Sequence, residues 1–222
     1  MFPDNYSILV VGDPSAGMFE FCCYLGATYL RSDENLVFVE ADSSPAKVRQ
    51  QIRDFHADPM KHEADGSFVL LDCSSPRSDL PARSGSVAGC DISDLEGLLE
   101  HVNEGIEAVG GSPVRVLFNS LTPLYMYHDP EDVAGFFTEL SANVKLTGIL
   151  TCTVHQTILG TEQIEPLVSL ADSVMDMMVD EHYKRFVRIR HMRGANVAPK
   201  WVPFEFIRAE EPSGGTLLSW DR

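Results

Sequence analysis

The sequence predicts one α/β domain with a largely parallel sheet, helices on both faces, and an antiparallel extension at its C-terminal end. Short runs of Val, Ile, Leu and Phe alternate with amphipathic stretches, as is typical of parallel strands buried on both faces. The first run ends in a glycine-rich turn, and the last three runs follow one another without a helix between them. We therefore expect a single domain over residues 1–210 and a tail over residues 211–222.

The first half of the chain predicts three strands. Residues 9–11 form the first, followed by a helix to about residue 30, and residues 36–39 form the second. The Ser-Ser-Pro sequence at 43–45 offers a hydroxyl cap and a first-turn proline for the next helix. Residues 68–72 form a third strand. The segment 73–90 is rich in Ser, Pro, Gly and charged residues, so we expect a flexible loop there.

The second half continues the alternation and then changes. A capping box at residue 93 opens a helix to about 109, residues 114–118 form a strand, and Asp129-Pro130 opens another helix. A strand at 148–154 and a helix at about 162–171 complete the repeating part. Three further strands are expected at residues 174–179, 185–191 and 203–207. A turn at 181–183 joins the first two of them.

Charge and cysteine content limit the function classes. The net charge is −16, from 33 acidic and 17 basic residues, which argues against non-specific binding to nucleic acid or an anionic membrane. The five cysteines include no C-x-x-C pair, so we expect reduced thiols. No signal segment or apolar run of membrane length is visible, and we expect a soluble, cytoplasmic protein.

The turn after the first strand has the layout of a phosphate-binding loop, which is a strand, then G-x-x-x-x-G, then a helix. The positions concerned are Gly12, Asp13, Pro14, Ser15, Ala16, Gly17, Met18 and Phe19. Backbone N–H groups and the helix N-terminus carry much of the anion binding in such loops. The Lys and the Ser or Thr that should follow are replaced by Met18 and Phe19. The alternative is a tight strand-to-helix turn that binds nothing.

A second defect lies at the end of the strand at 114–118. The acid that holds Mg²⁺ in a Walker-B strand is here Asn119, whose amide cannot offset the charge of the ion. The bland interpretation is a buried strand with a polar end. The loop and the strand therefore both lack a group needed for Mg²⁺-dependent ATP hydrolysis.

Several short motifs, in this order, make the chain resemble the single-domain KaiC-like branch of the RecA superfamily, which is mostly archaeal and bacterial. They are G-D-P-S-A-G at 12–17, V-E-A-D-S-S-P at 39–45, D-I-S-D-L at 91–95, V-L-F-N-S-L-T at 116–122, D-P-E-D-V at 129–133, G-I-L-T at 148–151, L-A-D-S-V at 170–174 and I-R-H-M-R-G at 189–194. The resemblance covers about residues 7–207 and implies a RecA-like P-loop domain.

The resemblance also implies where the catalytic groups should be. The family's paired glutamates after the second strand align with Asp42 and Ser43, whereas Glu40 lies two residues too early. Asp42 is thus a candidate catalytic acid or, equally, a helix cap.

The family's Lys-x-Arg pair, which reaches the nucleotide of a neighbouring subunit, here reads His191-Met192-Arg193. Arg193 corresponds to the arginine of that pair and is the second candidate catalytic residue. Its alternative is a surface base beside a turn glycine. His155 ends the strand at 148–154 and is either a sensor of the phosphates or a polar strand end.

Three functions remain open. The preferred one is a catalytically degenerate KaiC-like module in regulation or assembly, with a site around residues 12–19, Asn119, His191 and Arg193 that binds ATP or ADP weakly and for which Mg²⁺ is doubtful. The second is an active ATPase that uses a base supplied in trans. The third is a scaffold that binds no nucleotide. The resemblance implies a homo-oligomer, and we expect a protein partner rather than nucleic acid, since no basic patch with interleaved aromatics is present.

Overall fold

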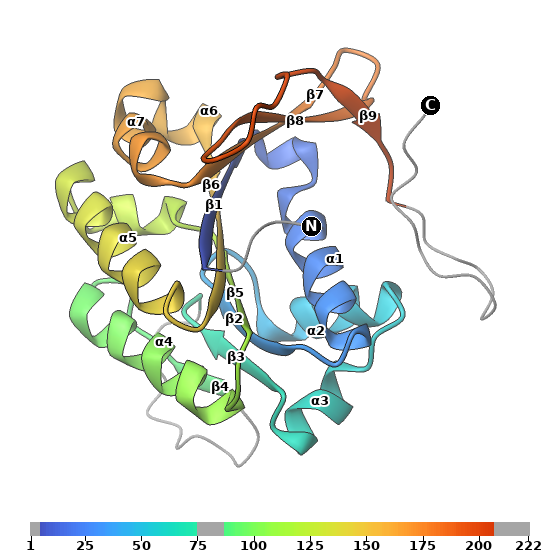
Figure 1. Cartoon of the computed structure of the whole chain (residues 1–222), viewed down its shortest axis with the longest axis vertical. Helices are drawn as coiled ribbons and strands as arrows, with labels where there is room; N and C mark the ends of the chain where they lie inside the picture. The colour runs from blue at the N-terminus through green and yellow to red at the C-terminus, as the bar shows by residue number, and fades with distance from the viewer. Residues whose placement is uncertain (1–4, 75–86, 207–222) are drawn as a thin grey trace.

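The computed structural model describes residues 5–74 and 87–206, which form one sheet with helices packed on both of its faces (Figure 1). The strands in spatial order are β4-β3-β2-β5-β6-β1-β7-β8-β9. Their bounds are β1 Tyr6–Gly12, β2 Asn35–Glu40, β3 Phe68–Asp72, β4 Val87–Gly89, β5 Val114–Asn119, β6 Gly148–His155, β7 Ser173–Val179, β8 Arg185–Met192 and β9 Val202–Phe204.

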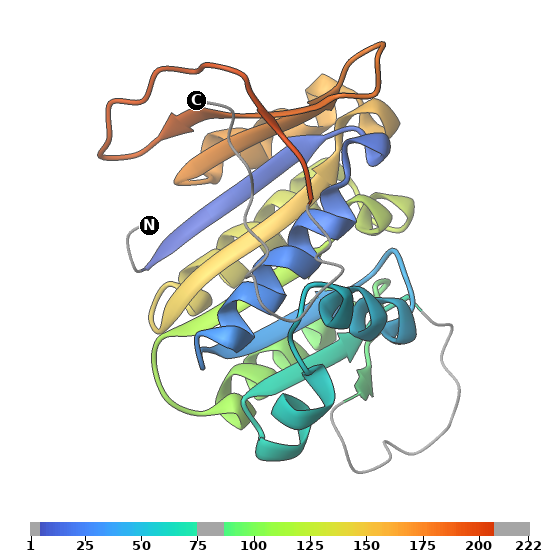
Figure 2. The ribbon, with the colours of Figure 1, turned by 90° about the vertical axis from the view of Figure 1, so that its right-hand side faces the viewer.

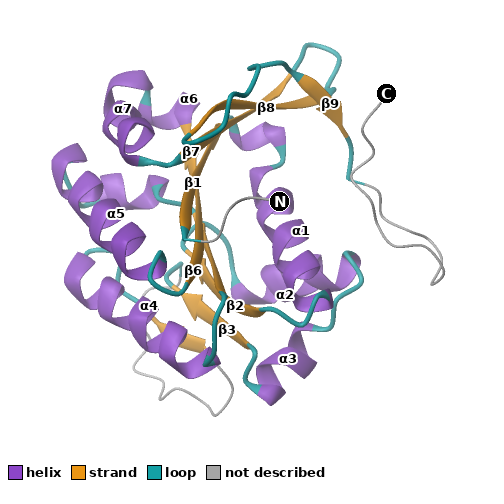
Figure 3. Ribbon diagram, viewed as in Figure 1, coloured by secondary structure: helices purple, strands orange, loops and turns teal. Residues whose placement is uncertain are grey.

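Helices α1 to α3 lie on one face of the sheet, and α4, α5 and α7 lie on the other (Figure 3). Their bounds are α1 Met18–Arg31, α2 Pro45–Asp54, α3 Pro59–Asp65, α4 Leu95–Val109, α5 Pro130–Val144, α6 Gln156–Leu159 and α7 Thr161–Leu170. Two 3-10 turns, η1 Pro14–Ala16 and η2 Thr122–Met126, follow β1 and β5. Among the described residues, no helix has both the length and the apolar character to cross a membrane.

The strands from β4 to β7 are parallel, and β8 and β9 are added antiparallel, as the sequence predicts. The central strands are almost fully buried because helices cover both of their faces, which explains their uninterrupted apolar runs. The side view shows β7, β8 and β9 extending beyond the amino-terminal end of α1 (Figure 2). The carboxyl ends of β1, β2, β5 and β6 share one edge, since Gly12 is paired with His155 and Glu40 with Asn119.

The structure corrects some of the expected elements. The short strand β4 lies inside the segment 73–90 that we expected to be a loop, and residues 75–86 of that segment fall outside the described residues. Helices α3 and α6 and the turn η2 were not expected. The tail at 211–222 and the domain boundary at 210 also fall outside the described residues.

Candidate functional site

The loop between β1 and α1 is folded on itself. Residues Pro14 to Ala16 form a 3-10 turn in which the N–H of Ala16 donates to the carbonyl of Asp13 at 2.9 Å. Pro14 has no N–H to offer. Gly17 has a φ of 86°, which favours glycine, and it opens α1 without a side-chain cap. At least one loop amide that a phosphate would need is thus already bonded within the turn.

Met18 is fully buried and lies across the start of the loop. Its sulfur lies 3.1 Å from the place a Cβ would take on Gly12, and its side chain packs with Val10, Phe21 and Met177. Phe19 is half-buried and contacts the separate apolar cluster between α1 and α2. The residue at the expected Lys position therefore fills apolar space and gives the loop no charge.

The start of α1 is covered by the C-terminal extension. A Cβ on Gly17 would lie 3.0 Å from the Phe206 ring and 3.1 Å from Nε of Arg185. The guanidinium of Arg185 lies over that ring, 5.8 Å from its centroid, and its buried Nε has no hydrogen-bond partner among the described residues. Sequence reasoning missed both residues, because nothing local links β8 and β9 to the loop.

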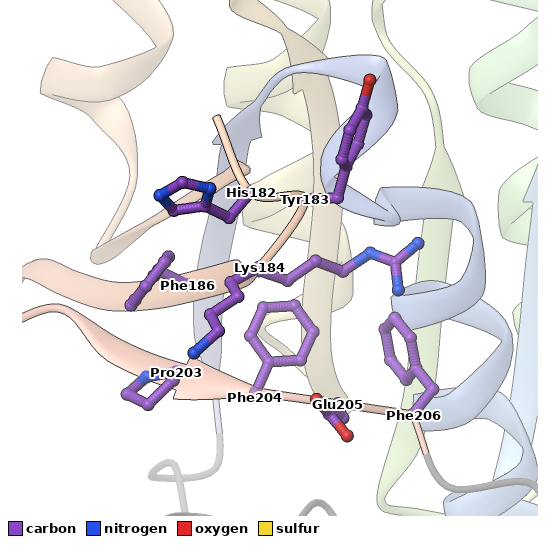
Figure 4. A pocket seen from close by; sticks show the side chains of 9 residues that line it. His182, Tyr183, Lys184, Phe186, Pro203, Phe204, Glu205 and Phe206 are labelled. Carbon is purple, nitrogen blue, oxygen red and sulfur yellow. The ribbon is translucent and has the colours of Figure 1, made fainter. Parts of the chain in front are cut away.

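A cleft of about 680 Å³ opens beside this cover (Figure 4). Its walls come from the turn before β8 and from the segment around β9, and they include Tyr183, Lys184, Phe204 and Phe206. The cleft therefore combines aromatic rings with basic side chains, and its lining includes no residue of the loop at 12–19.

Asn119 holds a buried carboxyl group. Its Nδ2 donates to Oε1 and Oε2 of Glu40 at 3.1 and 3.0 Å, and its Oδ1 accepts from the hydroxyl of Thr153 at 3.2 Å. Oε1 of Glu40 also accepts from the N–H groups of Asp42 and Ser43 at 2.8 and 2.6 Å. All three side chains of this network are essentially inaccessible to solvent.

Burial raises the pKa of Glu40 to about 7, although the N–H of Asp42, the amide of Asn119 and the N–H of Ser43 favour the ionised form. Sequence reasoning set Glu40 aside because it counted positions along the chain. The structure brings it to Asn119 because β2 and β5 are neighbours in register. The carboxyl closest to the Walker-B position is thus bonded on both of its oxygens by the protein.

Asp42 and His155 meet over the same edge. Nε2 of His155 lies 3.1 Å from Oδ2 of Asp42, and the buried Nδ1 of His155 has no partner among the described residues. The N–H of His155 donates to the hydroxyl of Thr122 at 2.8 Å. The candidate acid is therefore paired with the candidate sensor, one on each side of the strand that ends at Asn119.

His191 and Arg193 lie at the other end of the parallel strands, beside the amino-terminal ends of β1 and β7. Arg193 pairs with Asp172, with Nη1 and Oδ1 2.5 Å apart, and the hydroxyl of Tyr6 donates to the Arg193 carbonyl at 2.7 Å. A ring nitrogen of His191 lies 3.3 Å from the carbonyl of Ala171. These residues flank the start of β1, about 20 Å from Gly12 at the usual rise of a strand. Within one chain they do not join the loop.

Asp172 forms salt bridges with both Lys145 and Arg193 at this end of the strands. Burial alone would raise its pKa, but Lys145, at 2.8 Å, and the hydrogen bonds from Ser7 more than offset this, and the pKa lies below its usual value. Among the described residues no group of three or more His, Cys, Asp or Glu side chains is arranged to hold a metal ion.

Comparison with known proteins agrees with this architecture. The model of the family described as ATPase, KaiC, matches residues 1–210. A UPF0273 protein of Pyrococcus furiosus is 24% identical over 91% of this chain and 83% of its own length. The circadian clock protein KaiC3 of Synechocystis is 22% identical over 92% of this chain and 40% of its own. The crystal structure of a KaiC-like protein from Pyrococcus horikoshii has a TM-score of 0.73 and 20% identity, covering 98% of this chain and 91% of that one. The chain belongs to the KaiC ATPase family.

Proposed function

We propose that this chain is a catalytically inactive member of the KaiC family that acts as a regulatory or assembly module. The observation that carries the proposal is the buried Met18 at the position of the loop lysine. Phosphoryl transfer depends on electrostatic stabilisation of the transferring group, and a thioether supplies none. The amide of Asn119 in place of a carboxylate removes the second charge that would hold Mg²⁺.

Glu40 supports the same proposal. A general base needs a carboxylate that can reach a water molecule, but both oxygens of Glu40 are engaged by Asn119 and by two backbone N–H groups. Asp42 is the carboxylate at this edge that is more open to solvent, and it is paired with His155.

A scaffold that binds no nucleotide is the second candidate, and the packing of the C-terminal extension against Gly17 favours it. Phe206 and Arg185 lie against Gly17, the residue that opens α1, and this contact leaves less room for a ligand at that end of the helix.

Calorimetric titration of ATP and ADP, with and without Mg²⁺, tests the proposal and separates the two candidates. The matched control is Ser15→Glu, which adds a carboxylate at an exposed loop position without disturbing the core. Weak binding, near millimolar, that the control abolishes would support the regulatory module. No binding at all would support the scaffold. Micromolar binding that requires Mg²⁺ and is lost in the control would contradict both.

A further inference from the structure

A second cavity, of about 210 Å³, lies on the other side of β1 from α1 and borders the loop at Gly12 and Asp13. Its lining also includes Gln156 from α6, Asp176 from β7, Arg188 and Arg190 from β8, and Trp201. It is far smaller than the cleft beside Phe206 and shares no residue with it.

Asp176 anchors this cavity. The residue is 5% exposed and is the register partner of Val11, next to the end of β1. Its Oδ2 accepts from Nε of Arg188 at 2.6 Å. Arg190 adds Nε contacts at 3.1 and 3.2 Å to the two oxygens and an Nη2 contact at 2.5 Å to Oδ1.

A β-bulge interrupts β8 at the second of the two arginines. The register of β7 and β8 steps from Met175 opposite Ile189 to Val174 opposite His191, so Arg190 is the extra residue on β8. Bulges typically re-aim a side chain. Arg188 and Arg190 are two residues apart and share one face of β8, and the bulge leaves Arg190 without a register partner on β7, from where it reaches Asp176 beside Arg188.

Arg188 and Arg190 together carry more positive charge and more hydrogen-bond donors than a salt bridge to Asp176 requires. One guanidinium neutralises Asp176, and the second balances Asp13, the other carboxylate of the lining, in a chain whose net charge is −16. Arg188 bonds to Asp176 through Nε alone, and its terminal amines have no hydrogen-bond partner among the described residues. Its guanidinium lies 4.4 Å from the ring of Trp201, which fixes its plane.

We propose that this cavity is an anion site that takes a phosphoryl group, held by Arg188 and Arg190 and oriented by Asp176. Planar guanidinium groups bind phosphoryl oxygens in pairs, and prior orientation by a buried carboxylate lowers the entropy lost on binding. The amide of Gln156 adds a further donor at the rim. The proposed ligands of the phosphoryl group are side chains of β8, so the site does not require the N–H groups of the loop that it borders.

Trp201 provides the readout, because a ligand on Arg188 changes the surroundings of the indole. The titration uses inorganic phosphate in chloride buffer at constant ionic strength and follows tryptophan fluorescence in a Trp220→Phe background. We expect a saturable change that sulfate competes away and that chloride does not. A parallel titration with ADP separates the two sources of the group, because ADP binding that is tighter than phosphate binding and is weakened in Arg188→Lys would mean that the group belongs to a larger ligand.

Two variants and one control complete the test. Arg190→Gln and the charge-conserving Arg188→Lys should each weaken phosphate binding by at least about tenfold. Calorimetry replaces fluorescence for these variants, since they alter the surroundings of the indole. Arg53→Gln removes one positive charge from an exposed position on α2, where the side chain bonds to Gln50 and to no other residue of the described ranges, and it should leave the affinity unchanged. No saturable signal up to about 50 mM phosphate, or equal affinity in wild type and Arg188→Lys, would overturn the proposal.

Discussion

Replacing Asn119 with Asp would restore the Walker-B acid, and the structure predicts that this destabilises the protein. The new carboxylate would lie about 3 Å from the carboxyl of Glu40, in the place of the amide that now donates to both of its oxygens. The pair is buried, so water cannot screen the two charges. At neutral pH the two groups must share one proton.

The size of the effect follows from what is lost. A hydrogen bond to a charged group contributes about 1.5–3 kcal/mol, and like-charge repulsion adds to this above the pKa of the pair. We expect the free energy of unfolding to fall by about 3 kcal/mol at pH 8, equivalent to a decrease in Tm of about 6–12 °C for a chain of this size. At pH 5 the shared proton restores a donor, and the loss should shrink to about 1 kcal/mol.

Urea unfolding of wild type and Asn119→Asp at pH 5 and pH 8 measures this difference. The matched control is Asn103→Asp, which adds the same charge at a partly exposed site and keeps the acceptor that binds Asn143. Equal loss of stability at the two pH values, or no loss at pH 8, would refute the account of a buried carboxyl held by an amide.

Three further predictions follow from the same geometry. Because burial raises the pKa of Glu40 to about 7, from an ordinary 4.5, the folded state holds its proton more tightly. Stability should fall by up to about 3 kcal/mol as pH rises from about 4.5 to 7, and Glu40→Gln should lack this component in urea titrations. Gly17→Ala should cost about 1–3 kcal/mol in thermal unfolding, since its φ is 86° and its Cβ would crowd Phe206, whereas Gly135→Ala, in open space within α5, should gain up to about 1 kcal/mol. Asp172→Asn should lower stability at pH 7 by about 3 kcal/mol because Lys145 and Arg193 lose their charge partner. The depressed pKa of Asp172 means that its contribution is lost on acidification, and the difference from wild type should narrow toward pH 3.

The helices and strands were predictable wherever the sequence has a strong hydrophobic periodicity or a helix-capping residue. The buried runs of β1, β2 and β5 were identified because both faces of these strands are covered. The turn between β7 and β8 was also expected, and the structure shows why it forms: Asp180 accepts from the N–H groups of His182 and Lys184. Helix α3 was missed although Asp58-Pro59 is a cap signal, because only Pro59 and His62 of this helix are buried and no apolar stripe marks it.

The candidate site was predictable only in part. The loop could be recognised locally, but its cover comes from Arg185 and Phe206, which only the antiparallel extension brings back to Gly17. The pairing of Glu40 with Asn119 depends on strand order, which the sequence does not state. Arg188 and Arg190 share one face of β8 by their spacing, but their contact with Asp176 depends on the register of β7 and β8, which is a property of the folded sheet.

Mg²⁺-dependent ATP turnover by the purified wild-type protein, compared with Ser15→Glu, tests the central claim most directly. The account predicts that phosphate release is equal in the two proteins and does not respond to Mg²⁺, because Met18 and Asn119 supply neither the charge nor the metal ligand that the reaction requires. Turnover in wild type that rises with Mg²⁺ and disappears in Ser15→Glu would contradict it.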